Sequence, residues 1–165
     1  RAGDQVGCEL VEELTLEAPL VLPERGGVAV QLSVGPLNED DGLRTVQLYS
    51  RTRDDEVWTR HASGVLASSP SGGVSGEGLV EWPPAGAVAV DLGGFYEGLE
   101  YGPAFQGLRA AWRRGDEVFA EVAVDEVAGF GLHPVLLDSA LHAIGLGDYF
   151  SDTGRLPFAW SGVSL

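Results

Sequence analysis

Apolar and polar positions alternate through the first 67 residues in a way that predicts β-strands. The strand-like stretches are residues 11–23, 28–34, 44–52 and 57–67, because side chains of a half-buried strand point alternately to its two faces. The turn-forming sequences ERGG and GPLNEDDG separate the first three stretches, as is typical of hairpins. We therefore expect a meandering antiparallel sheet in this half of the chain.

The amino-acid composition of the chain changes after residue 67. Residues 68–90 are rich in Ser, Gly and Pro without sustained periodicity, which predicts a surface linker anchored by Trp82. Residues 91–99 predict a short helical turn. Residues 108–124 predict a hairpin that turns near Gly115.

An apolar run then predicts one helix of about three turns. Pro134 suits its first turn, and Gly145 and Gly147 would end it. The final stretch, RLPFAWSGVSL, returns to an extended pattern. Each half is therefore sheet-rich, and the second has a buried helix. A helix held by a curved antiparallel sheet is the hotdog arrangement, an α+β fold.

Two ionisable residues, Asp138 and His142, stand four apart inside this apolar helix, so they share one helix face. A carboxylate beside Leu137 and Leu141 is costly unless it is paired, hydrogen-bonded or protonated. One interpretation is a structural pair on a half-exposed face. The other is a general acid kept protonated by a dry pocket, with His142 orienting the acid or a departing hydroxyl.

The same residues give weaker support for a hydrolytic triad or a metal site. Asp138, Ser139 and His142 lack a nucleophile elbow and lie too close in one helix for a hydrolytic triad. A metal site that adds His133 matches no known ligand spacing. We interpret His61, on an expected strand, as a structural histidine.

Two aromatic motifs flank the helix in the sequence. In YGPAFQGL, Tyr101 precedes Gly and Pro, an arrangement that can fix the phenol, and Phe105 offers an apolar wall. Either this motif or LPFAWSG could instead be an aromatic plug at the entry of a strand.

Composition narrows the class of protein. The chain has 165 residues, of which 44% are hydrophobic, enough for one compact domain or two small ones. Its net charge of −15 disfavours nucleic acids and anionic membrane surfaces as partners. A single cysteine, Cys8, allows no internal disulfide and suggests a reducing compartment, the cytoplasm. The sequence has no methionine, which suggests a segment of a longer polypeptide.

The motifs YGPAFQGL, LHPVLLDSALHA and RLPFAWSGVSL occur in the order and approximate spacing of the dehydratase domain of modular polyketide synthases, which essentially the whole chain resembles. The resemblance implies a double hotdog that removes water from a β-hydroxyacyl thioester held by an acyl carrier protein. It implies Asp138 as the general acid, His142 as the polar partner (glutamine or histidine in the family), and Tyr101 lining the site. It implies no metal and no cofactor beyond the phosphopantetheine of the carrier.

The matched motifs also suggest how substrate and carrier are bound. We expect an apolar tunnel for the pantetheine arm, lined by residues of those motifs: Pro103, Phe105, Leu137, Leu156, Pro157 and Phe158. Arginines on the expected hairpin could form a carrier-docking patch, or could simply solvate a strand face: Arg109, Arg113 and Arg114.

The chain departs from the family in one important respect. The family's base histidine lies in an HxxxGxxxxP motif, and neither His61 nor His133 is followed by that pattern. We therefore expect the base upstream, and both outer ends of the domain to be missing. The expected division is residues 1–67 as part of the first hotdog, 68–90 as linker and 91–165 as the second hotdog. Expected partners are the carrier, neighbouring synthase domains and a second copy in a homodimer. Two alternatives remain open: a double-bond isomerase, and a non-catalytic hotdog scaffold or dimerisation module.

Overall fold

The computed structural model describes residues 2–52, 57–68, 80–98, 101–125, 129–149 and 156–164. Its contacts divide the chain into two units. The first comprises Arg1–Val74 together with Leu156–Leu165, and the second comprises Ser75–Arg155.

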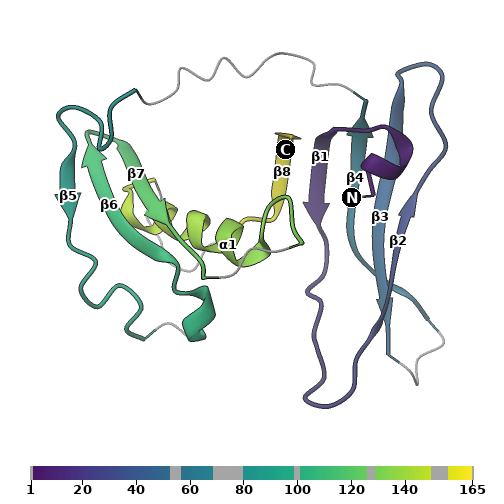
Figure 1. Cartoon of the computed structure of the whole chain (residues 1–165). Coiled ribbons are helices and arrows are strands. Elements are labelled where there is room, and N and C mark those ends of the chain that lie inside the picture. The colour runs from purple at the N-terminus through teal and green to yellow at the C-terminus, as the bar shows by residue number, and fades with distance from the viewer. Residues whose placement is uncertain are drawn as a thin grey trace. The chain divides into compact units, whose positions relative to one another are not determined.

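The first unit is built on a five-stranded antiparallel sheet in the order β2-β3-β4-β1-β8 (Figure 1). After a 3₁₀ turn, Asp4–Val6, its strands are β1 (Leu10–Leu16), β2 (Ala29–Val34), β3 (Leu43–Arg51), β4 (Thr59–Ala67) and β8 (Ala159–Ser164). Cys8, Val46 and Leu66 form its buried cluster. All four strands expected in the first half are present.

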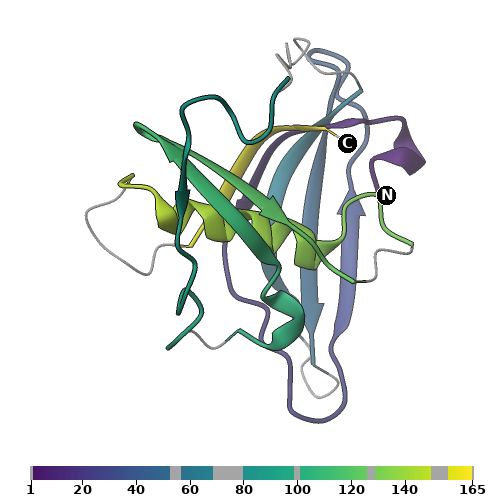
Figure 2. The ribbon, with the colours of Figure 1, turned by 60° about the vertical axis from the view of Figure 1, so that its left-hand side comes forward.

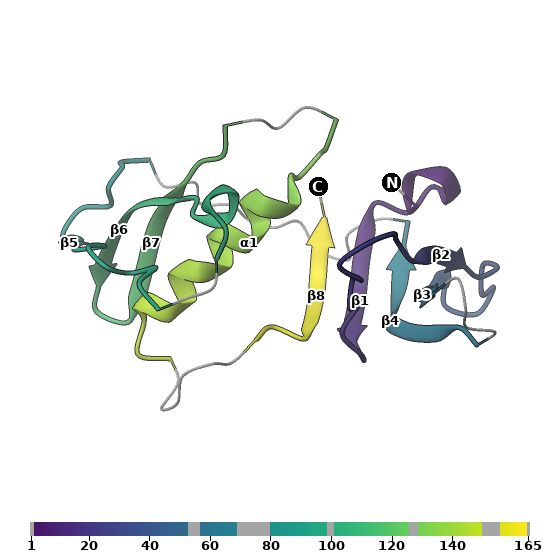
Figure 3. The ribbon, with the colours of Figure 1, turned by 90° about the horizontal axis from the view of Figure 1, so that it is seen from below.

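The order of these strands corrects the expected meander. β2, β3 and β4 follow one another as hairpins, but β1 pairs with β4 and β8 rather than with β2. Figure 3 shows β1 between β8 and β4. β1 ends at Leu16, so residues 17–28 connect it to β2. A connection of that length exceeds a hairpin loop of about 2–5 residues and can lead to a non-adjacent strand.

The second unit has a three-stranded antiparallel sheet, β5-β6-β7, with one helix against it. Its elements are β5 (Val88–Val90), a 3₁₀ turn η2 (Pro103–Phe105), β6 (Leu108–Arg114), β7 (Glu117–Val122), α1 (Pro134–His142) and a 3₁₀ turn η3 (Ala143–Leu146). Helix α1 contacts β6 and β7 and lies across them in Figure 2. The sheet and helix are the α+β hotdog elements that the sequence predicted.

The division into units differs from the expected one at two places. β5 lies within residues 68–90, the expected linker, and belongs to the second unit; residues 69–79 of that linker lie outside the described residues. Trp82 contacts Trp112 edge-on, with ring centroids 5.4 Å apart, which attaches this segment to the sheet. β8, expected in the second hotdog, pairs with β1 in the first unit. In the described part of the chain, no helix is long and apolar enough to cross a bilayer.

Candidate active site

Helix α1 positions both ionisable residues of the predicted site. Pro134 occupies its first turn, and the Val135 N–H donates to Nδ1 of the capping His133 at 3.2 Å. The chain then continues as η3 until Gly147 ends it. With this start, Asp138 and His142 lie one turn apart on the same face, as the sequence predicted.

The Asp138 carboxylate and the His142 imidazole meet at close range. Asp138 Oδ2 lies 3.2 Å from His142 Nε2. The orientation is not that of a hydrogen bond, so both buried atoms lack a hydrogen-bond partner among the described residues. Hydrogen bonds between catalytic groups are often poorly aligned in substrate-free proteins and tighten when substrate binds. The side chain of His142 is 6% exposed, whereas that of Asp138 is 39% exposed. Asp138 is therefore not enclosed in the dry pocket that we expected: one oxygen is buried, and the rest of the side chain is accessible.

Aromatic rings surround His142. The Tyr101 ring centroid lies 4.4 Å from that of His142, which brings together the three residues predicted as catalytic. The ring of Tyr96 lies 5.5 Å away, and that of Phe95 6.5 Å away. The Tyr101 carbonyl accepts a hydrogen bond from the Gln106 side chain, which closes the YGPAFQ turn.

Tyr96 is the residue of this cluster that sequence analysis missed. Its hydroxyl lies 3.0 Å from His142 Nδ1 and accepts a hydrogen bond from the Leu108 N–H at 3.1 Å. Tyr96 lies 46 residues before His142 in a stretch that we interpreted only as a turn. No periodicity or spacing connects the two, so only the tertiary fold identifies the contact.

Ser139 fixes the helix to the loop that carries the aromatic motif. It is fully buried. Its hydroxyl donates to the Phe105 carbonyl at 3.2 Å and accepts from the Gly107 N–H at 3.2 Å. A Cβ added at Gly107 would lie 2.5 Å from the Ser139 hydroxyl oxygen, so the close approach requires glycine. The hydroxyl is thus engaged with backbone, which argues against its use as a nucleophile.

The residues predicted to line a tunnel are distributed over both units. Pro103 and Phe105 form η2, and Leu137 lies on α1, all in the second unit. Phe105 and Leu137 are each 41% exposed. The other three, Leu156, Pro157 and Phe158, precede β8 in the first unit. A tunnel shared by all six therefore stays a prediction.

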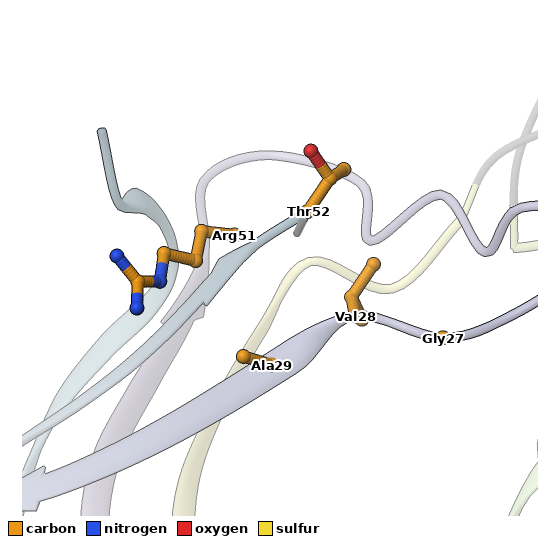
Figure 4. A pocket seen from close by; sticks show the side chains of 5 residues that line it. All are labelled: Gly27, Val28, Ala29, Arg51 and Thr52. Atoms are coloured by element: carbon orange, nitrogen blue, oxygen red, sulfur yellow. The ribbon is translucent and has the colours of Figure 1, made fainter. Parts of the chain in front are cut away.

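Two hollows of the first unit lie apart from these residues. The larger, of about 400 Å³, is lined by Gly27, Val28, Ala29, Arg51 and Thr52, where β2 begins and β3 ends (Figure 4). The other, of about 310 Å³, is lined by residues of β1 and β8: Glu12, Glu13, Ala159, Trp160 and Ser161. Neither contains a predicted site residue.

The three hairpin arginines do not form an uncompensated positive patch. Arg113 pairs with Asp148 at 2.6 Å, and Arg114 pairs with Glu117 at 2.9 Å. These hydrogen bonds to carboxylates raise the pKa of both guanidinium groups above their ordinary value. Arg109 is exposed on the same strand. The local charge is partly neutralised, which weakens the case for the patch as a docking surface, a role that stays a prediction.

The remaining histidines have structural contacts. His61 is buried, with Nε2 2.7 Å from the Ser50 hydroxyl and Nδ1 3.1 Å from the Ala18 carbonyl. His133 caps α1. In the described ranges, no group of three His, Cys, Asp or Glu side chains is placed to hold a metal ion.

Comparison with known proteins gives a consistent result. A family model described as "Polyketide synthase dehydratase N-terminal domain" matches residues 75–165, and one described as "Polyketide synthase dehydratase domain" matches residues 1–51. Polyketide synthase GfsA of Streptomyces halstedii is 59% identical over 180 residues, covering 100% of this chain and 2% of that protein. Pikromycin polyketide synthase component PikAII of Streptomyces venezuelae is 56% identical over 161 residues, covering 89% of this chain and 4% of that protein.

Solved structures agree with these sequence relationships. A structure from work on dehydratase substrate selection in the borrelidin and fluvirucin polyketide synthases is 50% identical, with a TM-score of 0.89. The match covers 99% of this chain and 61% of that one. The present chain thus spans less than two thirds of the solved domain, and a small part of the synthases that it resembles.

Proposed function

Because the chain belongs to the polyketide synthase dehydratase family, we propose that it contributes the acid half of a site that dehydrates β-hydroxyacyl thioesters on an acyl carrier protein. The observation that carries this proposal is the Asp138–His142 pair on α1, with its two facing atoms buried and 3.2 Å apart. A partly accessible carboxyl with one oxygen held against a buried imidazole can offer a proton to a bound hydroxyl.

Dehydration requires two proton transfers, and a different group carries out each of them. A base removes the proton at the α-carbon, and that electron pair becomes the α,β double bond. The C–O bond at the β-carbon breaks, and the hydroxyl leaves as water after it receives the proton of Asp138. Tyr101, whose ring lies against His142, would line the site beside the leaving group. Separating acid from base lets each have its own environment.

The base is proposed to be a histidine that precedes this sequence in the parent domain, as the family's HxxxGxxxxP motif implies. His61 is a poor candidate because both of its ring nitrogens lie within hydrogen-bond distance of protein groups. His133 is also engaged, because its Nδ1 accepts a hydrogen bond from the Val135 N–H.

The substrate would reach the site on the phosphopantetheine arm of a carrier domain in the same synthase. The relatives are multidomain synthases, and a tethered carrier has an effective concentration of about a millimolar, so a tight docking surface is not required. We also propose a cytoplasmic location and a homodimeric synthase, as the resemblance to modular polyketide synthases implies.

The test is Asp138→Asn in the complete dehydratase domain. The amide is nearly isosteric but has no acidic proton, so we expect dehydration of a carrier-bound β-hydroxyacyl thioester to slow by about 10²–10⁴. Mass spectrometry of the carrier measures the loss of water. Asp116→Asn, in the exposed turn after β6, is the matched control and should keep the wild-type rate. Wild-type turnover by Asp138→Asn would show that the acid lies elsewhere.

A further inference from the structure

Three segments of the second unit meet at one phenol. Tyr96 lies before the aromatic motif, Leu108 begins β6 and His142 ends α1. The Tyr96 oxygen is 3.1 Å from the Leu108 nitrogen and 3.0 Å from His142 Nδ1. The rings of Tyr96 and His142 meet edge-on at 73°.

The donors and acceptors of this cluster assign the protons. A backbone N–H can only donate, so the Tyr96 oxygen accepts from Leu108. A phenol has one O–H to give, and among the described residues His142 Nδ1 is the acceptor that lies within reach, at 3.0 Å. A neutral imidazole that accepts at Nδ1 carries its proton on Nε2, the atom that faces Asp138 Oδ2.

We propose that Tyr96 is a positioning residue for the dehydration described above, a role that rests on that proposed function. Its hydroxyl donates to Nδ1 and so holds His142 as the Nε2–H tautomer. The proton then lies on the nitrogen that faces Asp138 Oδ2 at 3.2 Å, and Nε2–H can donate to that oxygen once substrate binding aligns the two groups. The transferable proton of Asp138 consequently resides on Oδ1, the oxygen not held against His142.

The opposite tautomer would place the proton where it cannot be used. With a hydrogen on Nδ1, the lone pair of Nε2 would face Asp138 Oδ2, and both atoms are buried. The contact would be repulsive unless Oδ2 carried the acid proton. That proton would then be held by His142 and turned away from substrate. Tyr96 therefore decides which oxygen of Asp138 is the acid.

The first measurement is the tautomer itself, by nitrogen NMR of the complete dehydratase domain labelled with ¹⁵N-histidine. Loss of the His142 signals in His142→Gln assigns them. In the wild type we expect a protonated Nε2 and an unprotonated Nδ1 on His142. A neutral Nδ1–H form, or an imidazolium at neutral pH, would overturn the proposal whatever the variants do.

The second measurement compares Tyr96→Phe with Tyr149→Phe, a half-exposed tyrosine of the same unit. Tyr96→Phe should shift the His142 nitrogen signals away from the Nε2–H form and lower kcat by about 10- to 10²-fold with little change in KM. Tyr149→Phe should change neither quantity.

A loss of stability in Tyr96→Phe with unchanged His142 signals would show a purely structural role. A changed tautomer with wild-type kcat would also contradict the proposal. Neither result would affect the Asp138→Asn test, so the two hypotheses can fail separately.

Discussion

At the scale of single residues, the site depends on one acceptor and one donor on opposite sides of the residue at position 142. The Tyr96 hydroxyl lies at Nδ1, and the Asp138 carboxylate lies at Nε2. A neutral histidine and a glutamine both offer an acceptor and a donor, whereas an aliphatic side chain offers neither. In this account His142 orients Asp138 and does not itself transfer a proton to substrate.

This role predicts different outcomes for two substitutions of His142. His142→Gln should keep the rate of dehydration within about tenfold of the wild type, because its amide can accept from Tyr96 and donate to Asp138. His142→Leu should lose about 10² in kcat, since the carboxyl is no longer oriented. The measurement is kcat for water loss, with circular dichroism to confirm folding. Equal losses in both variants would show that the imidazole does more than orient.

At the scale of elements, the link between α1 and the loop before β6 holds the site together. Ser139 makes this link with both roles of its hydroxyl, one to the Phe105 carbonyl and one to the Gly107 N–H. Both contacts are made by a fully buried side chain. Ser139, the residue next to Asp138, is therefore a structural anchor for the helix.

Ser139→Ala should lower the free energy of unfolding by about 1–3 kcal/mol, because it leaves the buried Gly107 N–H and the partly buried Phe105 carbonyl without their partner. Denaturant titration of the complete domain measures the change. Ser161→Ala, at an exposed position of β8, should change the same quantity by less than about 0.5 kcal/mol. If both variants unfolded alike, the Ser139 contacts would not stabilise the domain.

A second prediction at this scale concerns the sheet of the first unit. Glu17 accepts hydrogen bonds from Ser63 at 2.5 Å and from Arg60 at 2.7 Å, which lower its pKa below the ordinary value of 4.5. A carboxylate with a lowered pKa in the folded state stabilises the fold above its unfolded pKa, and this contribution is lost as the pH falls through the lower, folded value.

Glu17→Gln should therefore be less stable than the wild type at pH 7, and the difference should shrink as the pH drops below about 4.5. Glu24→Gln, in the exposed connection between β1 and β2, should show no such dependence. Unfolding midpoints across this range provide the comparison. A Glu17→Gln deficit that stayed constant at low pH would exclude a contribution from its ionisation.

The sequence predicted most of the helices and strands but not every strand or every strand pairing. Pro134 located the start of α1, because the fixed φ of proline suits the first turn of a helix. Gly147 follows the last residue of η3 as expected, whereas Gly145, which was also expected to end the helix, lies inside η3. β5 was missed because a three-residue strand has too short a pattern to detect. The pairing of β1 with β4 was also missed, because strand order depends on long-range contacts that hydrophobic periodicity does not encode.

At the scale of the whole molecule, the motifs identified three residues that lie together but not the tyrosine that contacts them. Asp138, His142 and Tyr101 were predicted as catalytic residues, a role that stays a prediction, and the structure brings their side chains together around the imidazole. Tyr96 was not, because a contact between segments far apart in sequence leaves no local signal. The arginines of β6 illustrate the same limit: the carboxylate partners of Arg113 and Arg114 partly neutralise a group that looked positive in sequence.

The large negative charge of the chain bears on the carrier that we propose as its partner. At −15, this chain would repel an acidic carrier at long range. Covalent tethering within a synthase removes the need for electrostatic attraction, because the second partner is already at high effective concentration.

Whether Asp138 supplies the proton for the leaving group can be tested by changing the leaving group. Chloride departs without a proton, so a β-chloroacyl thioester needs the base but not the acid. We predict that Asp138→Asn slows loss of water from the β-hydroxyacyl thioester by about 10²–10⁴, while loss of chloride proceeds at close to the wild-type rate. Equal slowing of both eliminations would contradict the account, because Asp138 would then be needed for a step other than protonation of the hydroxyl.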